Sequence, residues 1–138
     1  MPPATQPLRY VIQRHSYAGF DHFDFMFEEA GRETLRSFQL PDEPTPENLA
    51  AGISCRELAP HRKDYLSYEG EVSRGRGTVK IWDAGLLSVR KATKARMELA
   101  LESEREMRHP TWMLSFMGGA DWHLVVPNVS GRWALKYL

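Results

Sequence analysis

Two side chains with complementary chemistry stand two residues apart in the stretch DHFDFMF, residues 21–27. Alternate residues of a β-strand point to the same side, so His22 and Asp24 would lie side by side on one face. The opposite face would then carry three phenylalanines, which is typical of a core. A neutral imidazole beside a carboxylate suits Mn²⁺, Zn²⁺ and similar ions. The alternative interpretation is a solvated polar face with a surface histidine.

A metal site needs a third ligand, and the sequence offers two further histidines near this strand. His15 ends the preceding predicted strand, so a hairpin would bring it back toward His22. His61 lies in a predicted loop, PHRKDY, where Arg62 and Lys63 would suit an anionic substrate. Exposure to water is the alternative for both, because runs of charge are usually solvated. His109 and His123 are interpreted as structural.

The stretch SRGRGTVK, residues 73–80, combines Arg74 and Arg76 with two glycines. It lacks the Lys-Ser/Thr pair of a phosphate-binding P-loop, and no helix is predicted after it. A glycine bend with exposed arginines is the favoured interpretation. Because the chain has no G-x-S-x-G and no C-x-x-C motif, a serine hydrolase or a zinc ribbon has no support.

Short strands separated by turn signals must position these residues. The alternation of apolar and polar residues and the Gly and Pro breaks predict a mainly β fold, a small antiparallel β-barrel with short helical or loop insertions. A proline-rich loop is predicted at 41–52, with a helical turn near Asn48, and a turn is predicted at Asp-Ala-Gly, 83–85. Strands are predicted at 8–15, 20–29, 34–40, 53–58, 78–82 and 96–102, and in TWMLSFMGG, DWHLVVP and GRWALKYL.

The composition fits one domain, with residues 1–7 as a flexible lead-in and 8–138 as the folded unit. Of 138 residues, 42% are hydrophobic and 26% charged, with zero net charge, so bulk charge does not indicate a strongly basic nucleic-acid binder. Cys55 is the single cysteine, which excludes an intrachain disulfide and favours a buried thiol in a reducing, cytoplasmic location. We expect no membrane segment, because no stretch reaches roughly 20 apolar residues, and we expect a monomer.

Several motifs in a fixed order resemble a known family. VIQRH, HFDFMFE, HRKDYLSYEGEV, GTVKIWDAG and GRWAL occur in this order across residues 8–138. The order resembles that of the 3′-phosphoesterase domain of bacterial DNA ligase D, which has Q-K-H, H-Y-D-F-R-L-E, H-P-L-D-Y-x-x-F-E-G, G-T-V-x-x-W-D-x-G and G-R-W-x-L. The resemblance implies a small β-barrel that removes a 3′-ribonucleoside or 3′-phosphate from nucleic-acid ends in DNA repair, with Mn²⁺ as cofactor.

The resemblance also implies roles for individual residues. The metal ligands would be His15, His22 and Asp24, with Zn²⁺ or Co²⁺ as alternatives to Mn²⁺. His61 would contact the scissile phosphate, and Tyr65 would orient it. The substrate would be a DNA or RNA–DNA 3′ end, with other repair proteins as further partners.

Two cationic positions of the family are not cationic here. Met26 stands where the family has a phosphate-binding arginine, and Asp42 stands where it has a lysine. Arg14, Arg62 and Arg76 are candidate substrate-binding substitutes, and Arg56 and Arg74 are further candidates, although nothing in the sequence places any of these arginines over the metal. The departures leave an alternative function open, a non-catalytic or repurposed barrel that binds nucleic-acid ends or a protein partner. A metal enzyme for a smaller or less charged phosphoester is a third possibility.

Overall fold

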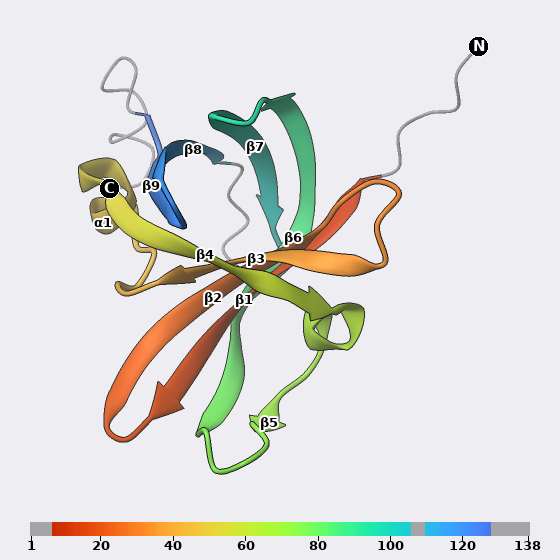
Figure 1. Cartoon of the computed structure of the whole chain (residues 1–138), viewed down its shortest axis with the longest axis vertical. Helices are drawn as coiled ribbons and strands as arrows, with labels where there is room; N and C mark the ends of the chain where they lie inside the picture. Colours follow the sequence, from red (N-terminus) through yellow and green to blue (C-terminus); the bar gives the residue numbers. More distant parts are fainter. Residues whose placement is uncertain (1–6, 106–109, 128–138) are drawn as a thin grey trace.

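The fold is a closed antiparallel barrel of eight strands, and the structure, a computed structural model, describes residues 7–105 and 110–127. Each strand of the barrel is hydrogen-bonded to two neighbours in the order β1-β2-β3-β4-β9-β8-β7-β6, and pairing of β1 with β6 closes the ring (Figure 1). The strands are β1 (Leu8–Tyr17), β2 (Phe20–Glu28), β3 (Thr34–Leu40), β4 (Ile53–Arg62), β5 (Gly70–Glu71), β6 (Thr78–Ala92), β7 (Arg96–Ser103), β8 (Thr111–Gly118) and β9 (Asp121–Val125). The predicted fold class is confirmed.

The helical insertions are short. Helix α1 (Pro46–Ala51) follows the proline-rich loop, and the Thr45 side chain caps it by accepting a hydrogen bond from the Asn48 N–H. A 3₁₀ turn, η1 (Lys63–Leu66), follows β4. The predicted helical turn near Asn48 is therefore confirmed. No helix in the described part of the chain is long and apolar enough to cross a membrane.

The alternation in β2 divides its residues between two environments. Phe23, Phe25 and Phe27 lie in the main core inside the barrel and are at most 4% exposed. The other face of β2 lies on the outside of the barrel wall, where Met26 is buried in a separate small cluster with Val11 and Leu35. The aromatic face was predicted correctly, but Met26 does not face solvent or a groove, because η1 covers it.

The predicted turn at Asp-Ala-Gly, 83–85, is wrong: β6 runs through it without a break. Ile12 pairs with Asp83 while Gln13 pairs with Ile81, so Trp82 is an extra residue in a bulge. Gly85 allows a close approach instead of a turn, because a Cβ there would lie 1.9 Å from the Glu102 carbonyl oxygen. Glycine in a strand interior often marks such an approach.

The predicted strands of the C-terminal third are confirmed in part, and the loop predicted at His61 is wrong. The strand predicted at 96–102 is confirmed as β7, and the β8–β9 hairpin confirms two of the three C-terminal strands. The third, GRWALKYL, lies outside the described residues, as do His109 and residues 1–6 of the lead-in. His61 does not lie in a loop, because β4 extends to Arg62 and His61 pairs with Leu35 of β3.

Candidate metal centre

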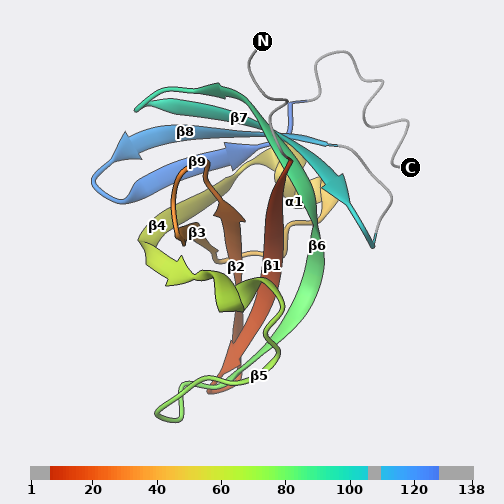
Figure 2. The same ribbon diagram turned by 90° about the vertical axis from the view of Figure 1, so that its right-hand side faces the viewer.

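The three predicted metal ligands converge on the outside of the barrel wall, near the end of the β1–β2 hairpin. His15 of β1 and His22 of β2 are direct cross-strand partners. Asp24 lies two residues farther along β2 and on the same face. Figure 2 shows this hairpin extending below the body of the barrel beside the lower end of β6 and β5.

The spacing of the ligand atoms fits a single ion. His15 Nδ1 lies 3.1 Å from His22 Nε2, and His22 Nε2 lies 3.3 Å from Asp24 Oδ1. The third distance, from His15 Nδ1 to Asp24 Oδ2, is 3.7 Å. Two ligands bound at about 2.0–2.1 Å with tetrahedral angles lie about 3.3 Å apart. The two imidazoles and the carboxylate thus already have the separation that coordination requires.

Asp24 carries the clearest sign that a cation belongs in this group. The residue is 8% exposed, and its Oδ1 atom is buried without a hydrogen-bond partner among the described residues. A buried carboxylate oxygen that accepts no hydrogen bond is costly, because it has lost its water without replacement. A divalent cation beside Oδ1 would remove this cost.

His15 is held in the orientation that a metal ligand needs. Its Nε2 lies 2.5 Å from the backbone carbonyl oxygen of Arg76, which can only accept, so the proton sits on Nε2. In a neutral imidazole, Nδ1 then keeps its lone pair and points toward His22 and Asp24. A second ring nitrogen bonded to a carbonyl is the usual support of a metal-binding histidine.

Gly77 makes this support possible. A Cβ on Gly77 would lie 2.0 Å from the Ser16 carbonyl oxygen, and its φ of +90° is unfavourable for other residues. The glycine in the GTV motif therefore lets the 72–77 loop lie against β1, so that the Arg76 carbonyl reaches His15. The Arg76 side chain bonds Ser73 within the same loop.

The donor set is compatible with several metals. Two imidazole nitrogens and one carboxylate are borderline ligands that suit Mn²⁺, Zn²⁺ or Co²⁺, and they leave coordination positions for water or substrate. One carboxylate and two neutral imidazoles give the group a net charge of −1, which attracts a divalent cation. The residues thus fit a metal, although they do not select which one.

His61 and Tyr65 lie on the same outer face, beyond Met26. His61 Nδ1 is 2.8 Å from Ser37 Oγ, and Ser37 is the cross-strand partner of Met26. The ring of Tyr65 packs edge-on against His61, with centroids 5.5 Å apart. Ser37 donates its own proton to the Leu35 carbonyl, so His61 Nδ1 is the donor in this pair and Nε2 is left for other partners.

Gln13 fixes the segment that carries Tyr65. Its amide nitrogen donates to the backbone carbonyls of Tyr65 and Tyr68, at 3.0 and 3.1 Å, and the residue is only 2% exposed. Gln13 also pairs with Asp24 across β1 and β2. This role was not predicted, although the period-two rule could have found it, because Gln13 stands two residues before His15.

The predicted substrate-binding arginines are not gathered at the metal group. Arg14 lies on the opposite face of β1, over the Phe23 ring, and is paired with Glu43. Arg62 is exposed at the end of β4, where the neighbouring His61 points to the other side. Arg76 reaches His15 through its backbone. Each would have to change its side-chain position to bind a phosphate at this ion.

The strand register places another cation on the same face as the metal group. Asp24 pairs with Gln39 of β3, and Gln39 pairs with Arg56 of β4. Cross-strand partners share a face, so exposed Arg56 stands in the same row as Asp24, two strands away. The sequence alone could not show this, because the pairing of β3 with β4 spans the proline-rich loop and α1.

A second polar cluster lies inside the barrel and is not part of this group. Asp83 accepts hydrogen bonds from the Tyr10 hydroxyl at 2.9 Å and the Ser103 hydroxyl at 2.7 Å. Burial, and next the charge of Asp83, raises the pKa of Tyr10. The cluster lines a cavity of about 360 Å³ together with Trp82 and Trp112. It holds none of the predicted site residues.

Cys55 is buried in the core, as predicted, and its thiol is unsuited to catalysis. Burial raises the pKa of Cys55 to about 12, with a further contribution from the charge of Glu57. The thiolate is the nucleophilic form, so this thiol is unreactive at neutral pH.

Comparison with known proteins adds no identification: no model of a protein family matches the chain, and no curated protein matches it.

Proposed function

We propose that this protein is a metal-dependent phosphoesterase that acts on 3′ ends of nucleic acid, removing a 3′-ribonucleoside or a 3′-phosphate. The observation that carries the proposal is the convergence of His15, His22 and Asp24 at coordination distances, with a buried Asp24 oxygen that lacks a hydrogen bond. The motif order adds the substrate class by resemblance. The setting would be DNA repair in the cytoplasm, in contact with other repair proteins.

The metal in this proposal is Mn²⁺, with Zn²⁺ and Co²⁺ as alternatives. When bound, it would supply Lewis-acid polarisation of a phosphate oxygen and a water of lowered pKa. His15, His22 and Asp24 would hold it, and the Arg76 carbonyl would keep His15 in the binding tautomer. The side chains of His15 and His22 are 17% and 26% exposed, so a chain end would approach the ion from the side of the histidines.

His61 and Tyr65 would act on the substrate from the side of Met26. With Nδ1 fixed by Ser37, His61 presents Nε2 as the group that donates to, or takes a proton from, a phosphoryl oxygen. Tyr65 holds the imidazole plane by edge-on packing. Arg56, exposed and in the row of Asp24, would be a cation on this face that approaches the phosphate where the family arginine is replaced by Met26.

A turnover assay tests the proposal. Purified protein with added Mn²⁺ should release phosphate from a DNA primer that ends in a 3′-phosphate, or release the nucleoside from a 3′-ribonucleotide end. His22→Ala should lower the rate by about 100-fold or more, because a ligand of the ion is lost. His123→Ala is the matched control, because it also removes a histidine but from β9, a strand that carries none of the three ligands. Equal rates for the wild type and His22→Ala on every such end would refute the proposal.

A second function is favoured by one observation. The two positions at which the resembled family has a cation are occupied by Met26, which is buried under η1, and by Asp42, which is exposed. Neither side chain carries a positive charge. This supports a barrel that keeps the metal and acts on a smaller phosphoester, or one that only binds nucleic-acid ends. Turnover of a generic phosphodiester without turnover of DNA ends would select the former. Binding of ends without any turnover would select the latter.

A further inference from the structure

Two exposed aromatic side chains stand at the tip of the β1–β2 hairpin. Tyr17 and Phe20 are direct cross-strand partners and are 54% and 79% exposed. Ala18 and Gly19 join them with φ angles of +52° and +83°, as in a two-residue turn of the hairpin type. The rings are therefore carried by paired strand residues and not by a loose loop.

Both rings lie on the face that carries the metal group. Tyr17 is two residues after His15, and Phe20 is two residues before His22, so all four side chains point to the same side of the hairpin. The aromatic pair and the histidine pair are separated along the strands by about 6.6 Å, the rise of two residues. The aromatic pair thus lies about one nucleotide length from the histidine pair.

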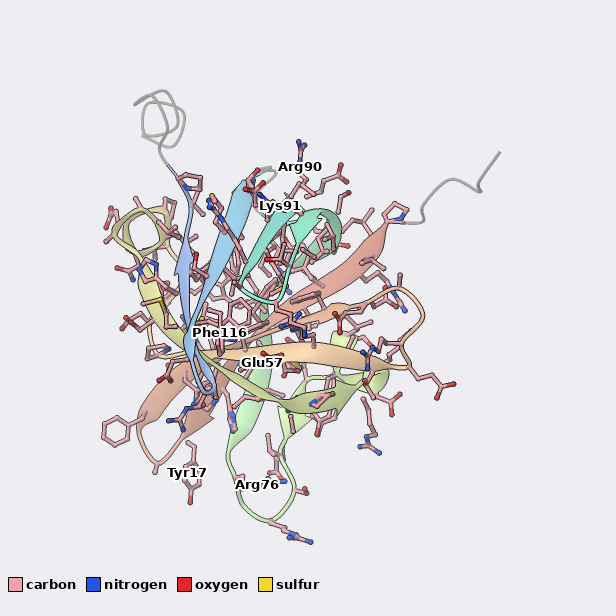
Figure 3. The ribbon with its side chains drawn as sticks, turned by 45° about the horizontal axis from the view of Figure 1, so that its top comes forward. Tyr17, Glu57, Arg76, Arg90, Lys91 and Phe116 are labelled. Carbon is pink, nitrogen blue, oxygen red and sulfur yellow. The ribbon has the colours of Figure 1, made fainter. Side chains whose placement is uncertain are left out.

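The loop that lies against Tyr17 carries exposed arginines, and both rings are more than half exposed. The 72–77 loop, with exposed Arg74 and Arg76, lies against Tyr17, because the Cβ position of Gly77 is 3.0 Å from Tyr17 Cβ. Figure 3 shows Tyr17 and Arg76 at the same end of the molecule. In the described part of the chain, neither Tyr17 nor Phe20 contacts another aromatic ring.

The β8–β9 hairpin shows what an ordinary exposed aromatic residue looks like in this protein. Phe116 is 43% exposed, but its ring packs against Trp122 with centroids 5.4 Å apart. It stands on a different hairpin from the metal ligands, so exposure alone does not distinguish the two tips. What distinguishes Tyr17 and Phe20 is that they share a face with the metal group.

We propose that Tyr17 and Phe20 form a stacking platform for the unpaired base next to the phosphoester, so that the substrate is a single-stranded 3′ end. The inference rests on the proposed function and adds the strand state of the substrate. Aromatic rings bind bases through their π-faces without sequence preference, and arginines beside them attract the phosphate chain. A duplex end would present its bases already stacked and would bind this platform less well.

Binding and turnover are measured separately to test the platform. Fluorescence anisotropy with a single-stranded DNA oligonucleotide ending in a 3′-phosphate should show a Kd at least about fivefold higher for Tyr17→Ala/Phe20→Ala. Phe20→Trp should retain binding, whereas Phe20→Leu, which keeps an apolar side chain, should lose it. Phe116→Ala is the matched control and should bind as the wild type does, and thermal unfolding verifies that each variant is folded.

Two substrate arms separate the platform from the proposed chemistry. The double variant should raise KM on the single-stranded end and leave turnover of p-nitrophenyl phosphate unchanged, because that substrate has no neighbouring base. An equal Kd for the wild type and the double variant overturns the platform whatever the activity. Absence of turnover by the wild type in both arms refutes the proposed function instead, while the anisotropy result still decides the platform.

Discussion

Two buried aspartates in this barrel have opposite surroundings. Asp83, inside the barrel, accepts hydrogen bonds from the hydroxyls of Tyr10 and Ser103 on its two oxygens. Asp24, on the outer wall, has a buried oxygen without a partner among the described residues and faces two imidazole rings. The carboxylate of Asp83 is satisfied by hydroxyl donors inside the protein, whereas a buried carboxylate oxygen with no hydrogen bond beside two histidines suits a cation.

The largest expected difference between the two aspartates is in metal binding. Asp24→Asn should weaken Mn²⁺ or Zn²⁺ binding by about 100-fold or more, because the charged ligand is lost and second-shell changes alone cost 10- to 100-fold. Asp83→Asn should leave the affinity unchanged. Isothermal titration calorimetry of both variants measures this. Equal loss in both would show that the two carboxylates do not differ in the way proposed.

In the metal-free protein, Asp83→Asn should lower the free energy of unfolding more than Asp24→Asn does. Asp83→Asn should lower the free energy of unfolding by about 2 kcal/mol, because charge-assisted hydrogen bonds from buried hydroxyls are worth roughly 1.5–3 kcal/mol. Asp24→Asn should cost less than about 1 kcal/mol or raise stability, since an uncompensated buried charge is removed. Urea unfolding in the presence of a chelator compares them. A larger loss for Asp24→Asn would mean that this carboxylate has an internal partner after all.

A substitution outside the ligands should produce an intermediate effect. Gly77→Ala would push the 72–77 loop off β1, since its Cβ would overlap the Ser16 carbonyl. The Arg76 carbonyl would then no longer fix His15, and metal affinity should fall by about 10-fold. Gly75→Ala is a matched control, because a Cβ at Gly75 meets no atom within 4 Å and both glycines have positive φ. Titration of the metal into both variants gives the comparison.

The smallest effect should come from Glu28, a carboxylate on the same face of β2 as Asp24. Glu28 accepts hydrogen bonds from Arg9, which lower its pKa from the ordinary 4.5. A lowered pKa means that Glu28 stabilises the fold above pH 4.5 and loses this contribution as the pH falls further. Glu28→Gln should therefore cost less than about 1 kcal/mol at pH 7, and the difference from the wild type should vanish toward pH 3. Thermal unfolding across pH 3–7 measures it.

The arrangement of the residues around Asp24 could be predicted in part from the sequence, because the alternation of side chains along a strand is a local property. The alternation in residues 20–28 placed His22 and Asp24 on one face and the phenylalanines in the core. A hairpin between the two predicted strands was expected to bring His15 back toward His22, and this is confirmed. Cys55 was predicted to be buried because it is the single cysteine of the chain, and it is buried in the core.

The rest depends on pairing between distant strands, which no local pattern encodes. The bulge at Trp82 turned an expected Asp-Ala-Gly turn into continuous strand, so Asp83 entered the barrel. The cover of η1 over Met26 depends on how η1 packs on β2, and the position of Arg56 in the row of Asp24 depends on the registers of β2, β3 and β4. Substrate-binding residues were therefore the least predictable part, because they come from several strands and loops.

The short sequence span of the metal group has a consequence for assembly of the protein. All three ligands come from residues 15–24, on one hairpin, whereas the Arg76 carbonyl that orients His15 arrives only when β6 pairs with β1. Contacts close in sequence form early in folding, and those that close long loops form late. We therefore expect a nascent hairpin to capture a metal ion weakly and the closing barrel to tighten its hold. The strength of metal binding would then report whether the ring of strands has closed.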